Sequence, residues 1–193
     1  MKKIIVVFSK ALKLMRSPAS EWKNIAAEEG GIRDLFVNFL LPFTLITMLA
    51  CFIGYGIVGS KQSMFGLVAS EKLGIRYALY YAFLLIGSIF ISTSVLSILA
   101  PFFEATSNFS RNFRLIVYSF SPSMTATLLL IIPLFAPLVL LAGIYNLIIL
   151  LSGLSRMTFV PINKKWGYFA AIVATLVFVF FAVAKILTRI IIN

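Results

Sequence analysis

The side chains that could do chemistry in this sequence are mainly hydroxyls and amides placed inside strongly apolar stretches. A polar group inside lipid is costly, so it faces another helix or water, and such positions are where function is found. Two uses fit these residues: close helix packing through small and hydroxyl side chains, or a polar path across the membrane. The candidate intramembrane polar or packing residues are Glu104, Ser92, Ser97, Tyr118, Ser121, Pro122 and Asn146.

Three of these candidates have more specific interpretations. Glu104 lies at the boundary of an apolar stretch, and Arg111 and Arg114 follow it in the same connection. An interfacial ion pair is the simpler interpretation, and a proton or cation site is the alternative. Asn146 is expected to clamp two helices through hydrogen bonds, or otherwise to orient a ligand. Pro122 is expected to kink its helix and to free a carbonyl that nearby serines satisfy.

The inventory of catalytic groups is poor. The chain has no histidine, which removes the commonest general base and the commonest metal ligand, and it has a single cysteine, Cys51. No nucleophile elbow, phosphate-binding loop, dinucleotide fingerprint or pair of intramembrane aspartates is found. A serine and lysine dyad is also disfavoured, because every lysine except Lys185 lies in a loop, a tail or the interfacial region. We therefore expect no enzyme activity, no metal and no cofactor.

The amino-acid composition indicates that these residues lie in a lipid bilayer rather than in water. Hydrophobic residues make up 61% of the 193, and charged residues only 12%, with a mean hydropathy of +1.05. Ordinary soluble domains have about 45–50% apolar and about 25% charged residues, so this chain is expected to be an integral membrane protein. Its net charge of +11 suits anionic lipid headgroups better than nucleic acid, and we expect no nucleic-acid partner.

Uncharged stretches predict five transmembrane helices in an all-α fold, because a crossing needs about 20 apolar residues. The stretch from Leu115 to Ser155 would reach about 60 Å as one helix, twice the hydrocarbon thickness, so it is expected to cross twice. Pro133 and Pro137 mark the hairpin between these two crossings. The segment 61–76 is expected to be a loop, with at most a surface helical turn. The predicted spans are about 35–59, 77–103, 115–132, 134–154 and 166–187.

Basic residues predict the orientation of this 35–193 transmembrane domain. They concentrate before the first span and in the connections that follow the second and fourth spans. The positive-inside rule then places the N-terminus in the cytoplasm and the C-terminus outside. A multi-pass protein of the bacterial cytoplasmic (inner) membrane is the expected setting. A re-entrant 115–155 stretch would move the C-terminus inside.

The segment 1–34 is expected to be cytoplasmic and interfacial. Its first residues place lysines on one arc of a helix and apolar residues such as Val7 and Leu12 on the other, which predicts an amphipathic helix in the headgroup layer. Packing on a soluble partner is the alternative. Ser17-Pro18 is typical of the start of a second helix, which Gly30-Gly31 ends. The candidate membrane-surface residues are Lys3, Lys10, Lys13, Arg16 and Trp22.

Several short patterns together resemble the Yip domain family, the Ypt/Rab-interacting membrane proteins, and in particular its short prokaryotic members. The pattern Tyr-Ser-x-x-Pro is found at 118–122. The resemblance implies a multi-pass, non-catalytic membrane protein with a cytoplasmic N-terminus. The Rab partnership of eukaryotic relatives is not carried over, because only about 34 residues precede the first span. The other matching residues are Ser17-Pro18, Trp22, Ile25, Glu28, Leu41-Pro42, Tyr145 and Gly153-Leu154.

Two functions from different classes are consistent with this sequence. The leading hypothesis is a non-catalytic protein that organises the membrane or binds proteins or lipids, with anionic headgroups as ligands and a membrane protein or a second copy as possible partner. The alternative is a small transporter, channel or lipid-translocating protein with a polar path between spans two to four.

Overall fold

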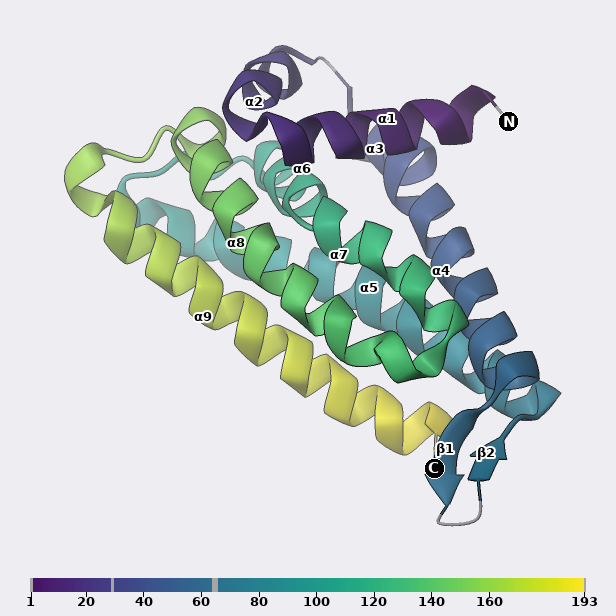
Figure 1. Cartoon of the computed structure of the whole chain (residues 1–193). Helices are drawn as coiled ribbons and strands as arrows, with labels where there is room; N and C mark the ends of the chain where they lie inside the picture. The colour runs from purple at the N-terminus through teal and green to yellow at the C-terminus, as the bar shows by residue number, and fades with distance from the viewer. Residues whose placement is uncertain (1, 29, 64–65, 193) are drawn as a thin grey trace.

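A computed structural model describes residues 2–28, 30–63 and 66–192 of the chain. Helices cross between two ends of one bundle (Figure 1). At one end, α1 (Lys2–Arg16) and α2 (Pro18–Ala27) lie across the ends of the other helices. At the opposite end lie a short hairpin and the last described turn of the chain.

The first crossing is a continuous helical stretch from Ile32 to Val58, close to the predicted 35–59. Two of its turns are π-helical, and Gly59 ends it with a positive φ of 90°, a conformation that glycine adopts without strain. Its parts are α3 (Ile32–Leu35), η1 (Phe36–Leu40), α4 (Leu41–Ile53) and η2 (Gly54–Val58).

The segment predicted as the loop 61–76 is more ordered than expected. Strands β1 (Ser60–Ser63) and β2 (Gly66–Val68) pair antiparallel, and α5 (Glu71–Leu99) begins directly afterwards. The side chain of Ser70 caps α5 by accepting the N–H of Leu73 at 3.2 Å, so the helix starts before its apolar part. A 3-10 turn, η3 (Ala100–Phe103), completes the second crossing.

The third crossing is bent. Helix α6 (Phe109–Ser119) and the stretch formed by α7 (Ser121–Ala126) and the 3-10 turns η4 (Thr127–Ile131) meet at 42°. Pro122 has no N–H to donate to the carbonyl of Tyr118, one turn earlier, and the hydroxyl of Ser121 donates to that carbonyl at 2.6 Å instead.

The polar residues 108–114, predicted as a connection, mostly belong to the first turns of α6. Asn108 accounts for this difference, because its side chain accepts the N–H of Arg111 at 3.1 Å and so caps a helix that begins before the apolar stretch. Arg111 and Arg114 are therefore held on a helix rather than in a loop.

The chain turns close to Pro133, where the sequence predicts a hairpin. Ile132 has an extended backbone that separates η4 from the 3-10 turn η5 (Pro133–Phe135), and α8 (Ala136–Thr158) follows. The last crossing is α9 (Ile162–Leu187) with the π-helical η6 (Thr188–Ile192). Among the described residues, four helical stretches are long and apolar enough to cross a membrane, and the bent pair α6–α7 supplies a fifth if it counts as one span. This confirms the all-α polytopic membrane fold.

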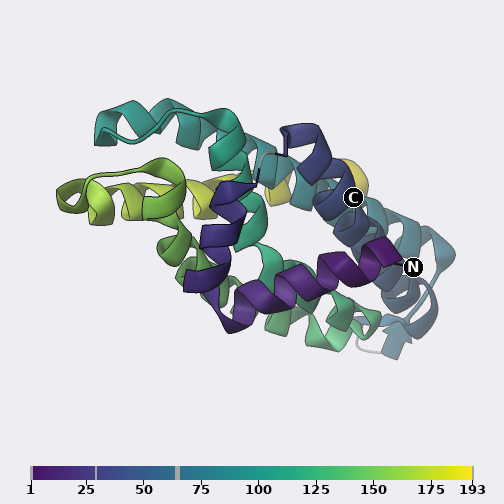
Figure 2. The same cartoon turned by 90° about the horizontal axis from the view of Figure 1, so that it is seen from above.

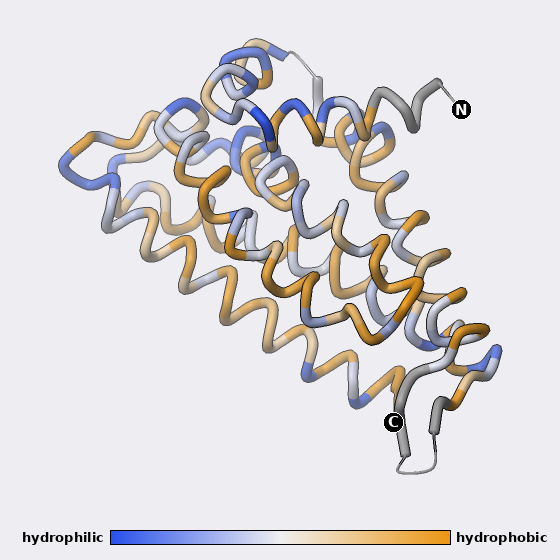
Figure 3. The backbone as a smooth tube through the Cα atoms, in the orientation of Figure 1, coloured by the Kyte–Doolittle hydropathy of each residue, from blue (hydrophilic) through white to orange (hydrophobic). Residues whose placement is uncertain are grey.

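Hydropathy along the backbone follows this architecture (Figure 3). Apolar colour covers the middle of the long helices, and hydrophilic colour concentrates at the two ends of the bundle. The amphipathic helix expected at the N-terminus is α1. Its apolar residues Val7, Ala11 and Leu14 are buried in the main core together with residues of the crossing helices, so α1 packs this face on the bundle rather than on lipid. Seen from above, α1 and α2 meet at an angle over the helix ends (Figure 2).

Candidate functional site

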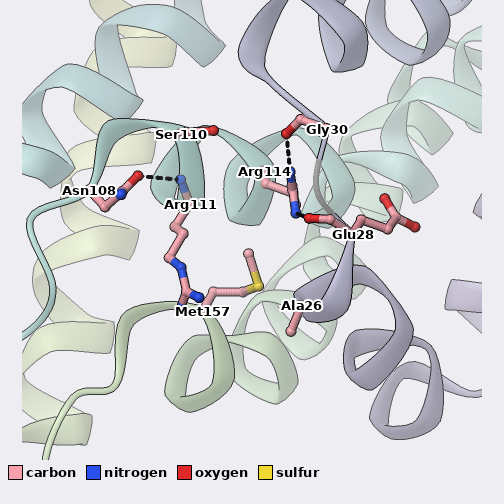
Figure 4. Close-up of a pocket in the computed structure, with 8 residues that line it drawn as sticks. All are labelled: Ala26, Glu28, Gly30, Asn108, Ser110, Arg111, Arg114 and Met157. Atoms are coloured by element: carbon pink, nitrogen blue, oxygen red, sulfur yellow. Dashed lines mark hydrogen bonds between the residues drawn. The ribbon is translucent and has the colours of Figure 1, made fainter.

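The connection between α2 and α3 is fastened by a buried arginine, Arg114. Its guanidinium donates to the backbone carbonyl of Ile25 at 3.1 Å. It also donates to the carbonyls of Glu28 and Gly30 (Figure 4). The residue is 8% exposed, and a buried charge is tolerated only when its hydrogen bonds are satisfied. The three carbonyls accept hydrogen bonds from the guanidinium of Arg114 and so satisfy its charge. Arg114 belongs to α6, so α6 holds the connection between α2 and the first crossing in place.

The carboxylate of Glu28 lies in a second network on the other side of this connection. It accepts hydrogen bonds from the ammonium of Lys10, with which it forms an ion pair, and from the hydroxyl of Tyr118 at 3.3 Å. The same ammonium lies 4.7 Å from the centre of the Tyr118 ring, a cation–π arrangement. Lys10, a candidate for the membrane surface, is therefore engaged within the protein by Glu28 and Tyr118.

Trp22 anchors α2 on α8. The residue is fully buried, and its indole N–H donates to the carbonyl of Ile149 at 3.0 Å. It lies so close to Gly153 that a β-carbon there would overlap the indole ring. The sequence analysis named Trp22 as a candidate membrane-surface residue, but the structure encloses it between helices, because Gly153 on α8 leaves space for the indole ring. The hydroxyl of Tyr145 on α8 also donates to the carbonyl of Met15.

Most of the exposed charge on α1, α2 and the start of the first crossing is basic, with Asp34 as an exposed acidic residue. Lys13, Arg16, Lys23 and Arg33 are all exposed on α1, α2 and the start of the first crossing. Lys3 belongs to α1, and its side chain lies outside the described residues. The packing of the apolar face of α1 thus leaves these basic side chains directed away from the core.

Two cavities flank the connection that Arg114 fastens. One, of about 190 Å³, is bounded by α2, by the start of α6 and by the end of α8 (Figure 4), and Asn108, Ser110, Arg111, Arg114 and Met157 are among its lining residues. The other, of about 220 Å³, lies against Lys10, Asp34, Asn38 and Tyr118. Both are smaller than the roughly 300–1,000 Å³ of pockets for drug-sized molecules. They have room for a headgroup or a small ion rather than for a large ligand.

The first of these cavities is electropositive. The guanidinium of Arg111 lies 4.7 Å from the centre of the Phe159 ring, and Arg114 binds carbonyls only. Within the described part of the chain, neither arginine forms an ion pair, because the carboxylates of Glu28 and Glu104 pair with lysines. Sequence analysis treated both arginines as loop charges. Both arginines lie within about one turn of the long uncharged stretch that begins at Leu115. This spacing was the signal in the sequence that could have placed them at the end of a helix.

The candidate polar residues of the second crossing are Ser92 and Ser97, of which Ser97 contacts α6. The hydroxyl of Ser97 accepts the side-chain N–H of Asn112 at 3.0 Å and donates to the carbonyl of Thr93 at 2.9 Å. Ser92 is buried, and its hydroxyl has no hydrogen-bond partner among the described residues. In the described part of the chain, the buried hydroxyls of Ser88 and Ser119 and the buried side-chain oxygen of Asn112 also have no hydrogen-bond partner.

The remaining candidates have identified partners. Asn146 accepts the N–H of Ser123 at 3.2 Å and donates to the Ser123 hydroxyl at 2.7 Å, which joins α8 to α7. Tyr118, Ser121 and Pro122 are buried around the bend in the third crossing.

Glu104 pairs with the ammonium of Lys164 at 2.6 Å, at an exposed position. Arg111 and Arg114, the partners expected from the sequence, are instead held on α6. The backbone N–H of Thr106 bonds to the carbonyl of Thr158 at 2.7 Å, which brings the connection after the second crossing next to the start of α9. This contact explains why the lysine of α9 is the partner.

Among the described residues, no group of three or more Cys, Asp or Glu side chains gathers where a metal ion could be held. Comparison with known proteins identifies a family but no individual relative. No curated protein and no solved structure matches the chain. The family model of the Yip1 domain matches residues 12–184, which cover the last part of α1, all of α2 and the crossings that follow as far as the last turn of α9. The chain therefore belongs to the Yip1 domain family of membrane proteins.

Proposed function

We propose that this protein is a non-catalytic membrane protein that binds anionic lipid headgroups at the end carrying α1 and α2, and so organises lipid around itself in the bacterial cytoplasmic (inner) membrane. This end faces the cytoplasm in the proposal, with the N-terminus inside and the C-terminus outside. A membrane-protein partner or a second copy of the chain is a further proposed neighbour, for which the apolar outer faces of α8 and α9 provide the area.

One observation carries this proposal. The apolar face of α1 is buried against the bundle, while Lys13 and Arg16 on the same helix are exposed. Leu12 is the exposed exception among the described apolar residues of this face. Because most of the face is held in the core, we infer that the contribution of α1 to the membrane surface is mainly electrostatic. A basic residue close to an anionic surface contributes about 1 kcal/mol, and several such residues on one rigid cap add their contributions.

The test compares two triple variants of equal charge. Lys13→Gln, Arg16→Gln and Lys23→Gln neutralise the N-terminal end, whereas Lys72→Gln, Lys185→Gln and Arg189→Gln neutralise exposed residues at the opposite end. Each protein is reconstituted in vesicles of phosphatidylglycerol and phosphatidylcholine and re-extracted in mild detergent, and the retained lipids are quantified.

We expect the wild type and the opposite-end variant to retain phosphatidylglycerol preferentially, and the N-terminal variant to lose most of this preference. High salt should reduce the preference in the wild type, because exposed charges are screened beyond about 10 Å at 0.1 M salt. Equal retention by all three proteins would contradict the proposal.

A second candidate function rests on the unpartnered buried hydroxyls. The buried hydroxyls of Ser88 and Ser92 on α5 and of Ser119 on α6 would find partners if water or a polar solute reached them. This supports a small transporter, channel or lipid-translocating protein. Flux of ions, solutes or labelled lipids across reconstituted vesicles that stops with Ser92→Val would favour this function, and tight vesicles would exclude it.

A further inference from the structure

We propose that the cavity between α2, α6 and α8 binds a phosphate group, supplied by the headgroup of an anionic membrane lipid. This inference deepens the proposed function and rests on it for the source of the phosphate. It names a defined site with its own residues, separate from the exposed lysines and arginines of the cap.

The charge of the cavity is the first argument. Arg111 and Arg114 both line it, and neither forms an ion pair with a described carboxylate. Glu28 contributes to the wall, but Figure 4 shows its carboxylate turned away from Arg111, toward Lys10 and Tyr118, which bind it. Guanidinium groups are preferred ligands of phosphate, because their N–H donors match its oxygens.

Some of the groups around the cavity are also held in place before any ligand arrives. Arg114 is held by three carbonyls, and the guanidinium of Arg111 lies against the Phe159 ring. Asn108, itself in the lining, holds the first turn of α6, a helix of 11 residues whose early backbone N–H groups have no intrahelical acceptor. Ordered donors lose little conformational entropy when they bind an anion.

Size and place favour a lipid headgroup as the source. At about 30 Å³ per molecule in the liquid, 190 Å³ corresponds to about six waters, enough for a phosphate but not for a whole lipid. The start of α6 and the end of α8, which line the cavity, lie at an end of the bundle where hydrophilic colour concentrates (Figure 3). Phe159, beside Arg111, is 60% exposed and offers an apolar surface next to the phosphate position.

The experiment measures binding to the full-length protein in a neutral detergent, from the shift of its thermal unfolding midpoint at constant ionic strength. The probes are dihexanoyl phosphatidylglycerol, dihexanoyl phosphatidylcholine and inorganic phosphate. Two variants target the cavity. Arg111→Gln removes a guanidinium, and Asn108→Asp keeps a good helix cap while placing a carboxylate in the lining. Lys165→Gln, at the same end but outside the lining, is the matched control. Arg114 is left unchanged, because it also holds the fold.

We expect phosphatidylglycerol to bind the wild type and Lys165→Gln with equal affinity, and to bind each cavity variant about tenfold or more weakly, the order of loss typical of a charged hydrogen bond. Stabilisation by inorganic phosphate alone, abolished by the same variants, would keep the phosphate site but assign it to free phosphate instead of lipid. Affinity unchanged in both cavity variants, or no stabilisation of the wild type by any probe, would overturn the proposal.

The two proposals fail separately. If the N-terminal triple variant loses its lipid preference while Arg111→Gln and Asn108→Asp bind normally, the surface function stands and the cavity proposal falls. If the cavity variants lose binding to phosphatidylglycerol while the triple variant retains its lipid preference, the cavity is a lipid site and the exposed basic residues of the cap are not responsible for the preference.

Discussion

Trp22 occupies the space beside Gly153 that any other residue at position 153 would need for its side chain. The indole N–H also donates to the carbonyl of Ile149, one turn earlier on α8. One aromatic side chain and one glycine thus fix the N-terminal helices on the fourth crossing. The cap formed by α1 and α2 is therefore part of the folded core and is not a separate surface helix.

The first prediction concerns this contact. Gly153→Ala should lower the free energy of unfolding by about 1–3 kcal/mol, because the added methyl group overpacks a filled slot. Gly143→Ala, on the same helix, is the control, since a β-carbon there meets nothing within 4 Å and alanine favours the helix. Unfolding in detergent, followed by tryptophan fluorescence, measures both, and an equal effect of the two variants would contradict the contact.

A double-variant cycle sharpens the same prediction. Trp22→Ala alone should cost about 3–5 kcal/mol through the cavity that it leaves. Combined with Gly153→Ala, the total should be smaller than the sum of the single effects, because the two residues share one space. Additive costs would show that the two positions do not interact.

The second prediction concerns Arg114. Arg114→Lys should raise the rate of amide hydrogen exchange in the connection from 28 to 31, because one ammonium cannot reach the three carbonyls that the guanidinium binds. The expected loss in the free energy of unfolding is about 2 kcal/mol or more. Arg33→Lys, at an exposed position nearby, should change neither quantity. If the exchange rates in this connection are the same in the variant and the wild type, Arg114 does not hold the connection through the three carbonyls.

The third prediction concerns the amide of Asn146. Asn146→Leu should cost about 0.5–2 kcal/mol, because it removes the hydrogen bonds to the N–H and hydroxyl of Ser123 that join α8 to α7. Ser123→Ala should lose part of the same energy. In a double-variant cycle, the coupling between the two positions should be about 0.5–1 kcal/mol, and zero coupling would argue that Asn146 has another role.

The fourth prediction tests the orientation in the membrane. Cys51 is buried, so Cys51→Ala gives a background for single cysteines at the exposed positions 20, 107 and 72. Ser20→Cys and Ser107→Cys lie at the end of α1 and α2, and Lys72→Cys lies at the opposite end. With the N-terminus inside, a membrane-impermeant maleimide should label only Lys72→Cys in intact cells and the other two after permeabilisation. The reverse pattern would invert the proposed topology.

Most of the fold could be predicted from the sequence because it depends on local quantities. Whether a stretch crosses the bilayer follows from its length and charge, and the hairpin near Pro133 followed from an uncharged stretch too long for one helix. The helix starts were less accurate. Ser70 and Asn108 cap α5 and α6 ahead of their apolar parts. The charged residues that follow these caps were predicted to lie in loops. That prediction was wrong, because charged residues alone do not end a helix.

The candidate site was much less accessible to the same reasoning. Trp22 and Lys10 belong to an amphipathic segment, and a sequence pattern cannot tell whether the apolar side of such a segment faces lipid or protein. Glu28 and Arg114 carry opposite charges, yet they do not pair with each other. The carboxylate of Glu28 forms an ion pair with Lys10, and the guanidinium of Arg114 donates to backbone carbonyls. These choices depend on which groups the folded chain brings within reach.

The sequence by itself therefore determined that the chain is a membrane protein with several apolar helices, and which segment precedes the first of them, because the thickness and polarity of the bilayer act on each segment separately. Only the tertiary structure decided that α1 and α2 close over the bundle, that Trp22 fits against Gly153, and that Arg111 and Arg114 line one cavity. Hydrogen bonds and close packing act over a few ångströms between residues far apart in the chain, so their partners exist only once the helices are assembled.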